Sequence, residues 1–189
     1  MPQRGRRARA RGRRASDPAA PPEPDADPVE LARTIVLRQL AMQARTRQEL
    51  AEALRRRNVP AEAAEEVLDR MAEVGLIDDG EFARSWVDSR QQRRQLSRTV
   101  LRRELQRKGV DRELVDEAVD RVSSEDEHSA AQALAEKKLR SVRGLDRTVQ
   151  RRRIAGALAR RGFSSEIVQS VLRDLPLGEE DLDAGEARP

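Results

Sequence analysis

The chain has 189 residues, of which 38% are charged and only 2% are aromatic, and it contains neither cysteine nor tyrosine. The lack of cysteine excludes disulfides, thiolate metal sites and thiol catalysis. A core poor in aromatic residues must be built from Leu, Val, Ile and Ala, which favours several small helical cores over one large core. The formal net charge is only +4 while the sequence pI is about 10.4, because arginine keeps its proton at high pH. The distribution of charge is therefore more informative than its sum.

The first 30 residues are predicted to form a disordered tail. Seven arginines fall within the first 14 residues, and a Pro-rich acidic stretch that can form neither a helix nor a core follows them. The acidic segment 177–189 is expected to be a second disordered tail. The N-terminus lacks the hydrophobic core of a signal peptide, and no apolar run approaches the ~20 residues needed to span a bilayer. We therefore expect a cytoplasmic protein whose structured part is 31–176.

The structured part repeats one sequence pattern three times. Each copy has an aliphatic residue, a Leu four positions later, a basic run, and then Asn or Gly before an apolar residue. The copies begin at Leu50, Leu101 and Ile154, so their offsets are 51 and 53 residues. The aliphatic pair lies on one face of a predicted helix. That helix should end at the residue that best tolerates a left-handed conformation, which is Asn58, Gly109 or Gly162 in the three copies.

Each copy belongs to a larger unit of three predicted helices. The helix after the repeated segment carries an amphipathic stripe, and it starts at Pro60, Asp111 or Ser164, residues suited to a helix start. A more variable first helix precedes each copy, at 31–44, 82–92 and 130–139. The sequence thus predicts an all-α fold, a tandem array of three three-helix repeats that is elongated and curved. The repeats are assigned to 31–77, 78–123 and 124–176.

Charge is polarised within each unit. The three middle helices with their approaches (45–57, 93–108 and 143–161) hold 19 basic and four acidic residues. The third helices (61–75, 111–122 and 164–175) hold 12 acidic and four basic residues. One interpretation is a set of solvated faces with internal Glu–Arg pairs; the other is a basic edge that meets a repetitive polyanion or protein filament. The candidate contact residues are Arg93, Arg94, Arg98, Arg102, Arg103, Arg107, Lys108, Arg151, Arg152, Arg153, Arg160 and Arg161.

Catalysis finds little support in the sequence. His128 is the single histidine, and Ser124 with Glu127 has capping-box spacing, which indicates a helix start rather than a general base. The carboxylates near position 80 could bind magnesium, but a helix cap at Asp78 or Asp79 explains them better. We find no Gly-rich phosphate loop and no zinc-ligand spacing. We expect no enzyme activity, no cofactor, no metal and no small-molecule substrate.

Three segments together resemble RecX, the family that regulates the RecA recombinase. They are 76–90, which looks like the family signature, 45–50 upstream and 104–110 downstream. The likeness covers about 32–175. Residues 91–98 lack the Lys-Gly turn often found in the family, and Asn58 stands in place of the usual Gly. The residues assigned to the structural signature are Asp78, Asp79, Phe82, Trp86, Arg90, Gly109 and Gly162.

The resemblance implies a monomer that binds along the groove of the RecA–DNA filament, with secondary DNA contacts and no membrane partner. RecX proteins restrain filament growth and reduce ATP hydrolysis, strand exchange and SOS repressor cleavage. Two alternatives remain open from the residues alone. Three-helix units with a basic middle helix also resemble helix-turn-helix modules, which would make the chain an autonomous DNA-binding protein. A general protein-interaction scaffold is the other.

Overall fold

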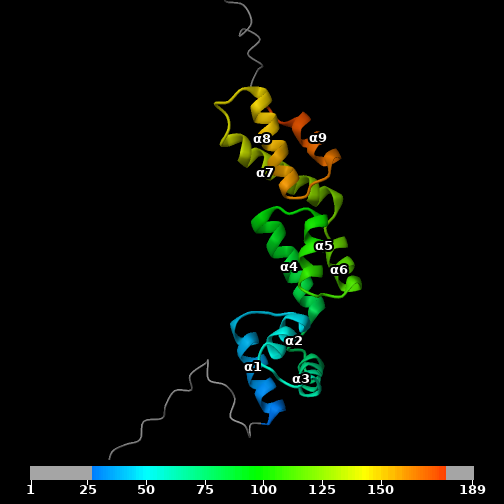
Figure 1. Cartoon of the computed structure of the whole chain (residues 1–189). Helices are drawn as coiled ribbons and strands as arrows, with labels where there is room; N and C mark the ends of the chain where they lie inside the picture. The colour runs from blue at the N-terminus through cyan, green and yellow to red at the C-terminus, as the bar shows by residue number, and fades with distance from the viewer. Residues whose placement is uncertain (1–26, 178–189) are drawn as a thin grey trace, which may run out of the picture.

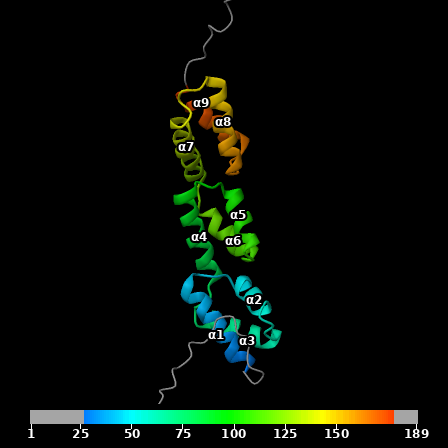
Figure 2. The same ribbon diagram turned by 60° about the vertical axis from the view of Figure 1, so that its left-hand side comes forward.

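The computed structural model describes residues 27–177, and within this part the chain forms nine helices and no strand. The first unit contains α1 (Pro28–Met42), α2 (Arg47–Arg55) and α3 (Ala61–Glu73). The second contains α4 (Asp79–Arg94), α5 (Arg98–Arg107) and α6 (Arg112–Asp120). The third contains α7 (Ser124–Arg140), α8 (Arg147–Arg160) and α9 (Ser165–Asp174). The units follow one another along a single long axis, so the predicted all-helical array of three three-helix repeats is confirmed (Figures 1 and 2).

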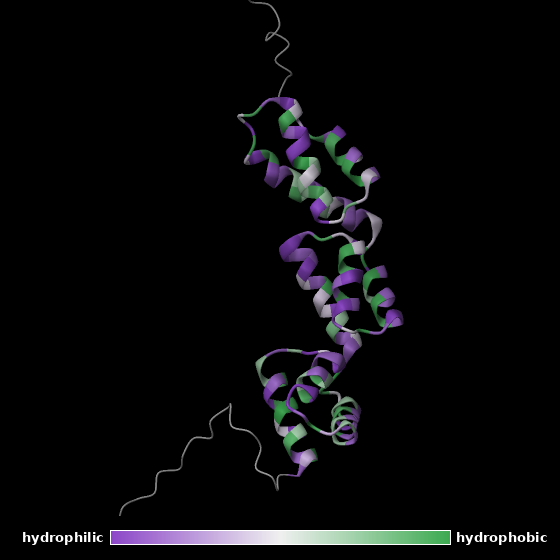
Figure 3. Cartoon of the chain, viewed as in Figure 1, coloured by the Kyte–Doolittle hydropathy of each residue, from purple (hydrophilic) through white to green (hydrophobic). Residues whose placement is uncertain are grey.

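Each unit has its own hydrophobic core. The apolar stripes of the middle and third helices face each other, and the first helix closes the core. Leu54, Leu105 and Leu158 occupy the same position in the three middle helices, and all three are fully buried. Burying one such side chain stabilises the folded state by about 1.5–3 kcal/mol. Hydropathy colouring shows apolar residues on the inner helix faces and polar residues outside (Figure 3).

The turn after each middle helix adopts the predicted conformation. The backbone φ angles of Asn58, Gly109 and Gly162 are 57°, 75° and 81°, in the left-handed region. The third helices then begin after Pro60, Asp111 and Ser164. The Asp111 and Ser164 side chains accept a backbone N–H of the first turn, which satisfies a donor that has no partner inside the helix.

The first helices are longer than the sequence pattern predicted. Helix α1 begins at Pro28 with Asp27 as its cap, so residues 28–30 belong to the first unit and not to the tail. Proline at the first helical position and an acidic cap explain this earlier start. In α7 the capping box consists of Ser123 and Asp126, so the predicted pair one residue later was wrong. The remainder of the two predicted tails, 1–26 and 178–189, lies outside the described residues.

No helix within residues 27–177 combines the length and the apolar character that crossing a membrane requires.

Candidate functional site

The first and second units join where the start of α2 meets the end of α5. Thr46 caps α2 and is fully buried. Its Oγ1 donates a hydrogen bond to the carbonyl of Lys108, the C-cap residue of α5, at 2.6 Å. The same oxygen accepts a hydrogen bond from the Glu49 amide at 3.2 Å. Asp79, at the start of α4, accepts a hydrogen bond from the Arg47 amide at 2.9 Å through Oδ1. Backbone groups left open at the ends of two helices are therefore satisfied across the junction.

The second and third units join through the equivalent helices, where the start of α5 meets the end of α8. Ser97 caps α5 and is fully buried, and its amide donates to the carbonyl of Arg161 at the end of α8, at 3.1 Å. Glu127 in α7 accepts from the Arg98 amide at 2.9 Å, as Asp79 does from Arg47. The Arg161 guanidinium also donates to a carbonyl at the end of α4.

The three middle helices therefore meet end to end in the order α8, α5, α2. At each contact, the carbonyl end of one helix faces the amide end of the next, an arrangement that helix dipoles favour. The repeat in the sequence thus becomes a repeat in space, and all three basic helices have the same polarity along the array (Figures 1 and 2).

Glycine is required at both junctions for two reasons. Gly109 and Gly162 have positive φ angles, and each approaches the neighbouring unit closely. A Cβ atom on Gly162 would lie 2.6 Å from Ser97 Oγ and would overlap the Val100 side chain. A Cβ atom on Gly109 would lie 2.5 Å from the Cβ atom of Gln48. The two signature glycines therefore set the spacing between units as well as ending a helix.

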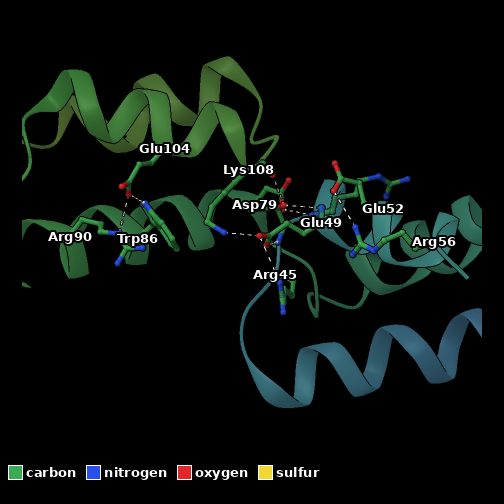
Figure 4. Close-up of polar contacts among 11 residues, drawn as sticks. Arg45, Glu49, Glu52, Arg56, Asp79, Trp86, Arg90, Glu104 and Lys108 are labelled. Carbon is green, nitrogen blue, oxygen red and sulfur yellow. Dashed lines mark hydrogen bonds and ion pairs between the residues drawn. The ribbon is translucent and has the colours of Figure 1, made fainter. Parts of the chain in front are cut away.

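A cluster that includes three of the signature residues supports the first junction (Figure 4). We call Phe82, Trp86, Arg90, Glu104 and Lys108 the Trp86 cluster. The Glu104 carboxylate accepts from Trp86 Nε1 and from Arg90 Nε, each at 3.0 Å. The Arg90 guanidinium carbon lies 3.8 Å from the Trp86 ring centroid, and Lys108 Nζ lies 4.4 Å from it. Phe82 stacks on the same ring with 5.6 Å between centroids, so cation–π and aromatic contacts both hold the cluster together.

Lys108 connects this cluster to the first unit. Its Nζ pairs with Glu49 Oε1 at 2.7 Å and lies over the rings of both Phe82 and Trp86. Both side chains of the pair are only 23% exposed, so this ion pair is screened less than one at the surface. Nearby, burial raises the pKa of the Asp79 carboxyl, and the hydrogen bond from the Arg47 amide opposes that shift.

The structure divides the predicted contact residues into two groups. The first group is engaged in ion pairs within the chain: Arg98 with Asp120 at 2.8 Å, Arg102 with Asp116 and Asp120 at 3.0 and 2.7 Å, and Lys108 with Glu49. The second group is exposed and has no ion pair with any described residue: Arg93, Arg94, Arg103, Arg107, Arg151, Arg152, Arg153 and Arg160. Arg161 is half-buried at the second junction. The interpretation as internal pairs therefore holds for the first group, whereas contact of the second group with a partner stays a prediction.

The sequence did not reveal the residues that join the units. Thr46 and Ser97 occupy equivalent positions before α2 and α5, so a hydroxyl repeated at the 51-residue offset was an available signal. The acceptors Asp79 and Glu127 gave no comparable signal because their partners lie in another unit. The helix cap predicted at Asp78 or Asp79 is Asp78, and Asp79 instead accepts the Arg47 amide of the first unit.

His128 lies within α7, and its Nε2 is 3.3 Å from Ser170 Oγ on α9. The side chain therefore contacts a hydroxyl inside its own unit.

Fold and charge together define an all-helical tandem-repeat protein that presents the same charged helix three times. Comparison with family models identifies the family within this class. The models described as the first, second and third three-helix domains of RecX match residues 32–71, 78–119 and 125–172. The chain belongs to the RecX family.

Individual relatives agree with this assignment. The chain is 51% identical over 162 residues to the regulatory protein RecX of Streptomyces coelicolor, covering 86% of both chains. It is 44% identical over 157 residues to that of Thermobifida fusca, covering 82% of this chain and 85% of the relative. The crystal structure of RecX from Lactobacillus salivarius superposes with a TM-score of 0.70 at 22% identity, over 78% of this chain and 96% of that one. A second crystal structure of a regulatory protein RecX gives a TM-score of 0.71 at 25% identity, over 78% and 74% of the two chains. These relatives are named as regulatory proteins rather than as enzymes.

Proposed function

We propose that this protein modulates the RecA recombinase, mainly as an inhibitor, by binding along the groove of the RecA–DNA filament. The observation that carries the proposal is the end-to-end repetition of one basic helix in three units of a RecX-family chain. A filament presents the same protein surface at regular intervals, and an array with a fixed repeat is suited to contact several subunits at once.

Multivalent contact explains how weak individual interactions would suffice. Once one unit is bound, the next is held near its own site at a high effective concentration, and the overall affinity exceeds that of any single unit. Flexible links between units would forfeit part of this gain because ordering them costs entropy. The buried caps Thr46 and Ser97 and the close approach of Gly109 and Gly162 avoid that cost.

A chain that bridges neighbouring RecA subunits would restrain both filament growth and the changes that accompany turnover. We therefore expect reduced ATP hydrolysis, strand exchange and SOS repressor cleavage. The protein would act as a cytoplasmic monomer with the RecA nucleoprotein filament as its main partner and DNA as a secondary one.

The test is the ATPase activity of RecA on single-stranded DNA with the full-length protein added below the RecA concentration. Substoichiometric inhibition is expected because each bound chain affects several subunits. ATPase activity that stays unchanged up to equimolar protein would refute the proposal. Submicromolar, sequence-selective binding to bare DNA, together with unchanged ATPase activity, would favour the autonomous DNA-binding alternative instead.

A further inference from the structure

Charge is distributed unequally among the three units. The first (28–77) holds eight basic and eight acidic residues, the second (78–123) holds 11 and 10, and the third (124–176) holds 11 and seven. The unit with the largest excess of basic residues, the third, has the fewest ion pairs within residues 27–177. All of them lie in the first two units or at the junction between these, and the third unit has none. The excess positive charge of the third unit is therefore not neutralised within the described chain.

The first two units pair the start of the middle helix with the third helix. Arg47 at the start of α2 contacts Asp69 of α3 at 2.7 Å. Arg98, at the equivalent position of α5, contacts Asp120 of α6 at 2.8 Å. Asp69 and Asp120 are themselves separated by the 51-residue offset of the repeat. One acidic position of the third helix thus neutralises one basic position of the middle helix in both units.

This pairing is lost in the third unit. Arg151 occupies the position of Arg98, but the position of Asp120 is taken by Arg173 at the 53-residue offset. The second acidic position, Asp116 of α6, becomes Gln169. The third helix of the last unit has therefore replaced its neutralising carboxylates with a basic and an amide side chain, and Arg151 is exposed without an ion pair among the described residues.

The start of α8 is also uncovered, unlike those of α2 and α5. No further unit follows α9 in the described chain to place a turn against it, and α8 has 14 residues where α2 has nine and α5 has 10. The additional turn brings Arg147 to the position one turn before Arg151, on the same helix face. We call Arg147, Arg151, Arg152 and Arg153 the α8 arginines; all four are exposed.

The loop that leads into α8 is held in place from inside. Gln150 is only 2% exposed, and its Nε2 donates to the carbonyls of Arg143 and Leu145 at 3.1 and 2.7 Å. The one acidic residue in the loop, Asp146, accepts the Thr148 amide at 2.8 Å as the helix cap. The backbone that carries the arginines is therefore ordered before any ligand binds, which lowers the entropic cost of binding.

We infer that the α8 arginines of the third unit bind the phosphate backbone of DNA. Exposed guanidinium groups without internal acidic partners are suited to phosphate, which they contact through directed, charge-assisted hydrogen bonds. The third unit has no Trp or Tyr, and its single Phe, Phe163, is buried, so it offers no exposed Phe, Tyr or Trp platform for base stacking. Binding is therefore independent of sequence and depends on salt. The inference deepens the proposed function by assigning the DNA contact within the filament to one unit.

The test measures binding of the full-length protein to a fluorescently labelled oligo-dT strand, without RecA, between 50 and 200 mM salt. Each phosphate contact to a single strand contributes about 0.7 to the slope of log K against log salt. The variant R151Q/R152Q/R153Q should lower the magnitude of that slope by about 2, since it removes three such contacts.

A matched control removes three consecutive arginines from the middle helix of the first unit. R55Q/R56Q/R57Q changes the net charge by the same amount, also at exposed positions. It retains the Arg-rich N-terminal segment, as the first variant does. We expect its slope to change by less than about 0.7, the value of a single contact. Equal losses in the two variants would mean that only net charge matters and would overturn the inference, as would wild-type binding by both.

The RecA assay separates this inference from the proposed function. If R151Q/R152Q/R153Q binds DNA like the wild type but no longer inhibits RecA, the α8 arginines meet an acidic protein surface, and the inference is wrong. If the wild-type protein binds DNA through these arginines and leaves RecA ATPase unchanged, the inference stands and the proposed function fails.

Discussion

Replacing Gly162 with alanine should destabilise the contact between the second and third units specifically. At a φ of 81°, alanine costs about 1–2 kcal/mol because its Cβ approaches the carbonyl oxygen. The new Cβ would also lie 2.6 Å from Ser97 Oγ and overlap Val100, and such overpacking costs about 1–3 kcal/mol. Gly75 is the matched control, since its φ is 72° and a Cβ there meets nothing within 4 Å. Gly162→Ala should therefore cost about 1–3 kcal/mol more than Gly75→Ala.

Urea denaturation of both variants gives this difference, and the effect of alanine on the unfolded chain cancels between them. Hydrogen exchange shows where in the molecule that stability is lost. The Ser97 amide donates across the junction to Arg161, so a loss of 2 kcal/mol there should accelerate its exchange by about 30-fold in Gly162→Ala. Its exchange should be unchanged in Gly75→Ala. Equal destabilisation in the two variants, with Ser97 equally protected, would refute the claim that Gly162 sets the distance between units.

Three further predictions concern the ion pairs, the Trp86 cluster and the first junction. Arg102→Ala should lower the free energy of unfolding by about 0.5–1 kcal/mol by releasing α5 from α6, whereas Arg103→Ala, without an ion pair, should change it by less than about 0.5 in the same urea titration. Glu104→Ala should cost about 1.5–3 kcal/mol, because two donors of the Trp86 cluster lose a charged acceptor, and tryptophan fluorescence should shift even before unfolding; an unchanged spectrum would contradict this. Asp79→Asn keeps an oxygen that accepts the Arg47 amide. Because burial raises the pKa of Asp79, the stability that this carboxyl contributes falls as the pH rises from its ordinary pKa of about 3.9 through its raised value. Across that pH interval, the free energy of unfolding of the asparagine variant should rise relative to that of the wild type, and below the interval the two values should be equal. A fall in the relative stability of the variant with rising pH would contradict burial as the main cause of the raised pKa.

Features that depend on neighbours along the chain could be predicted from the sequence. The left-handed turns at Asn58, Gly109 and Gly162 and the caps at Asp111 and Ser164 follow from local backbone preferences. The three cores follow from the helical spacing of aliphatic residues. Both kinds of signal act over one or two helical turns, which is why they were reliable.

Contacts between units could not be predicted in this way. The Thr46 hydroxyl meets a carbonyl 62 residues away, and no periodic pattern encodes that pairing. Charge counts also treated every arginine of a middle helix alike. Arg98 and Arg151 occupy equivalent positions, yet a carboxylate of the third helix neutralises the first and is absent for the second. The two residues differ because Asp120 of the second unit corresponds to Arg173 of the third.

Electron cryo-microscopy of RecA filaments on single-stranded DNA can establish whether the three units bind together along the filament. With the full-length protein added, we predict density in the filament groove in which one chain contacts successive RecA subunits, with the start of α8 nearest the DNA. Density confined to filament ends, or attached through a single unit with the other two in solvent, would show that the three units do not bind the filament together.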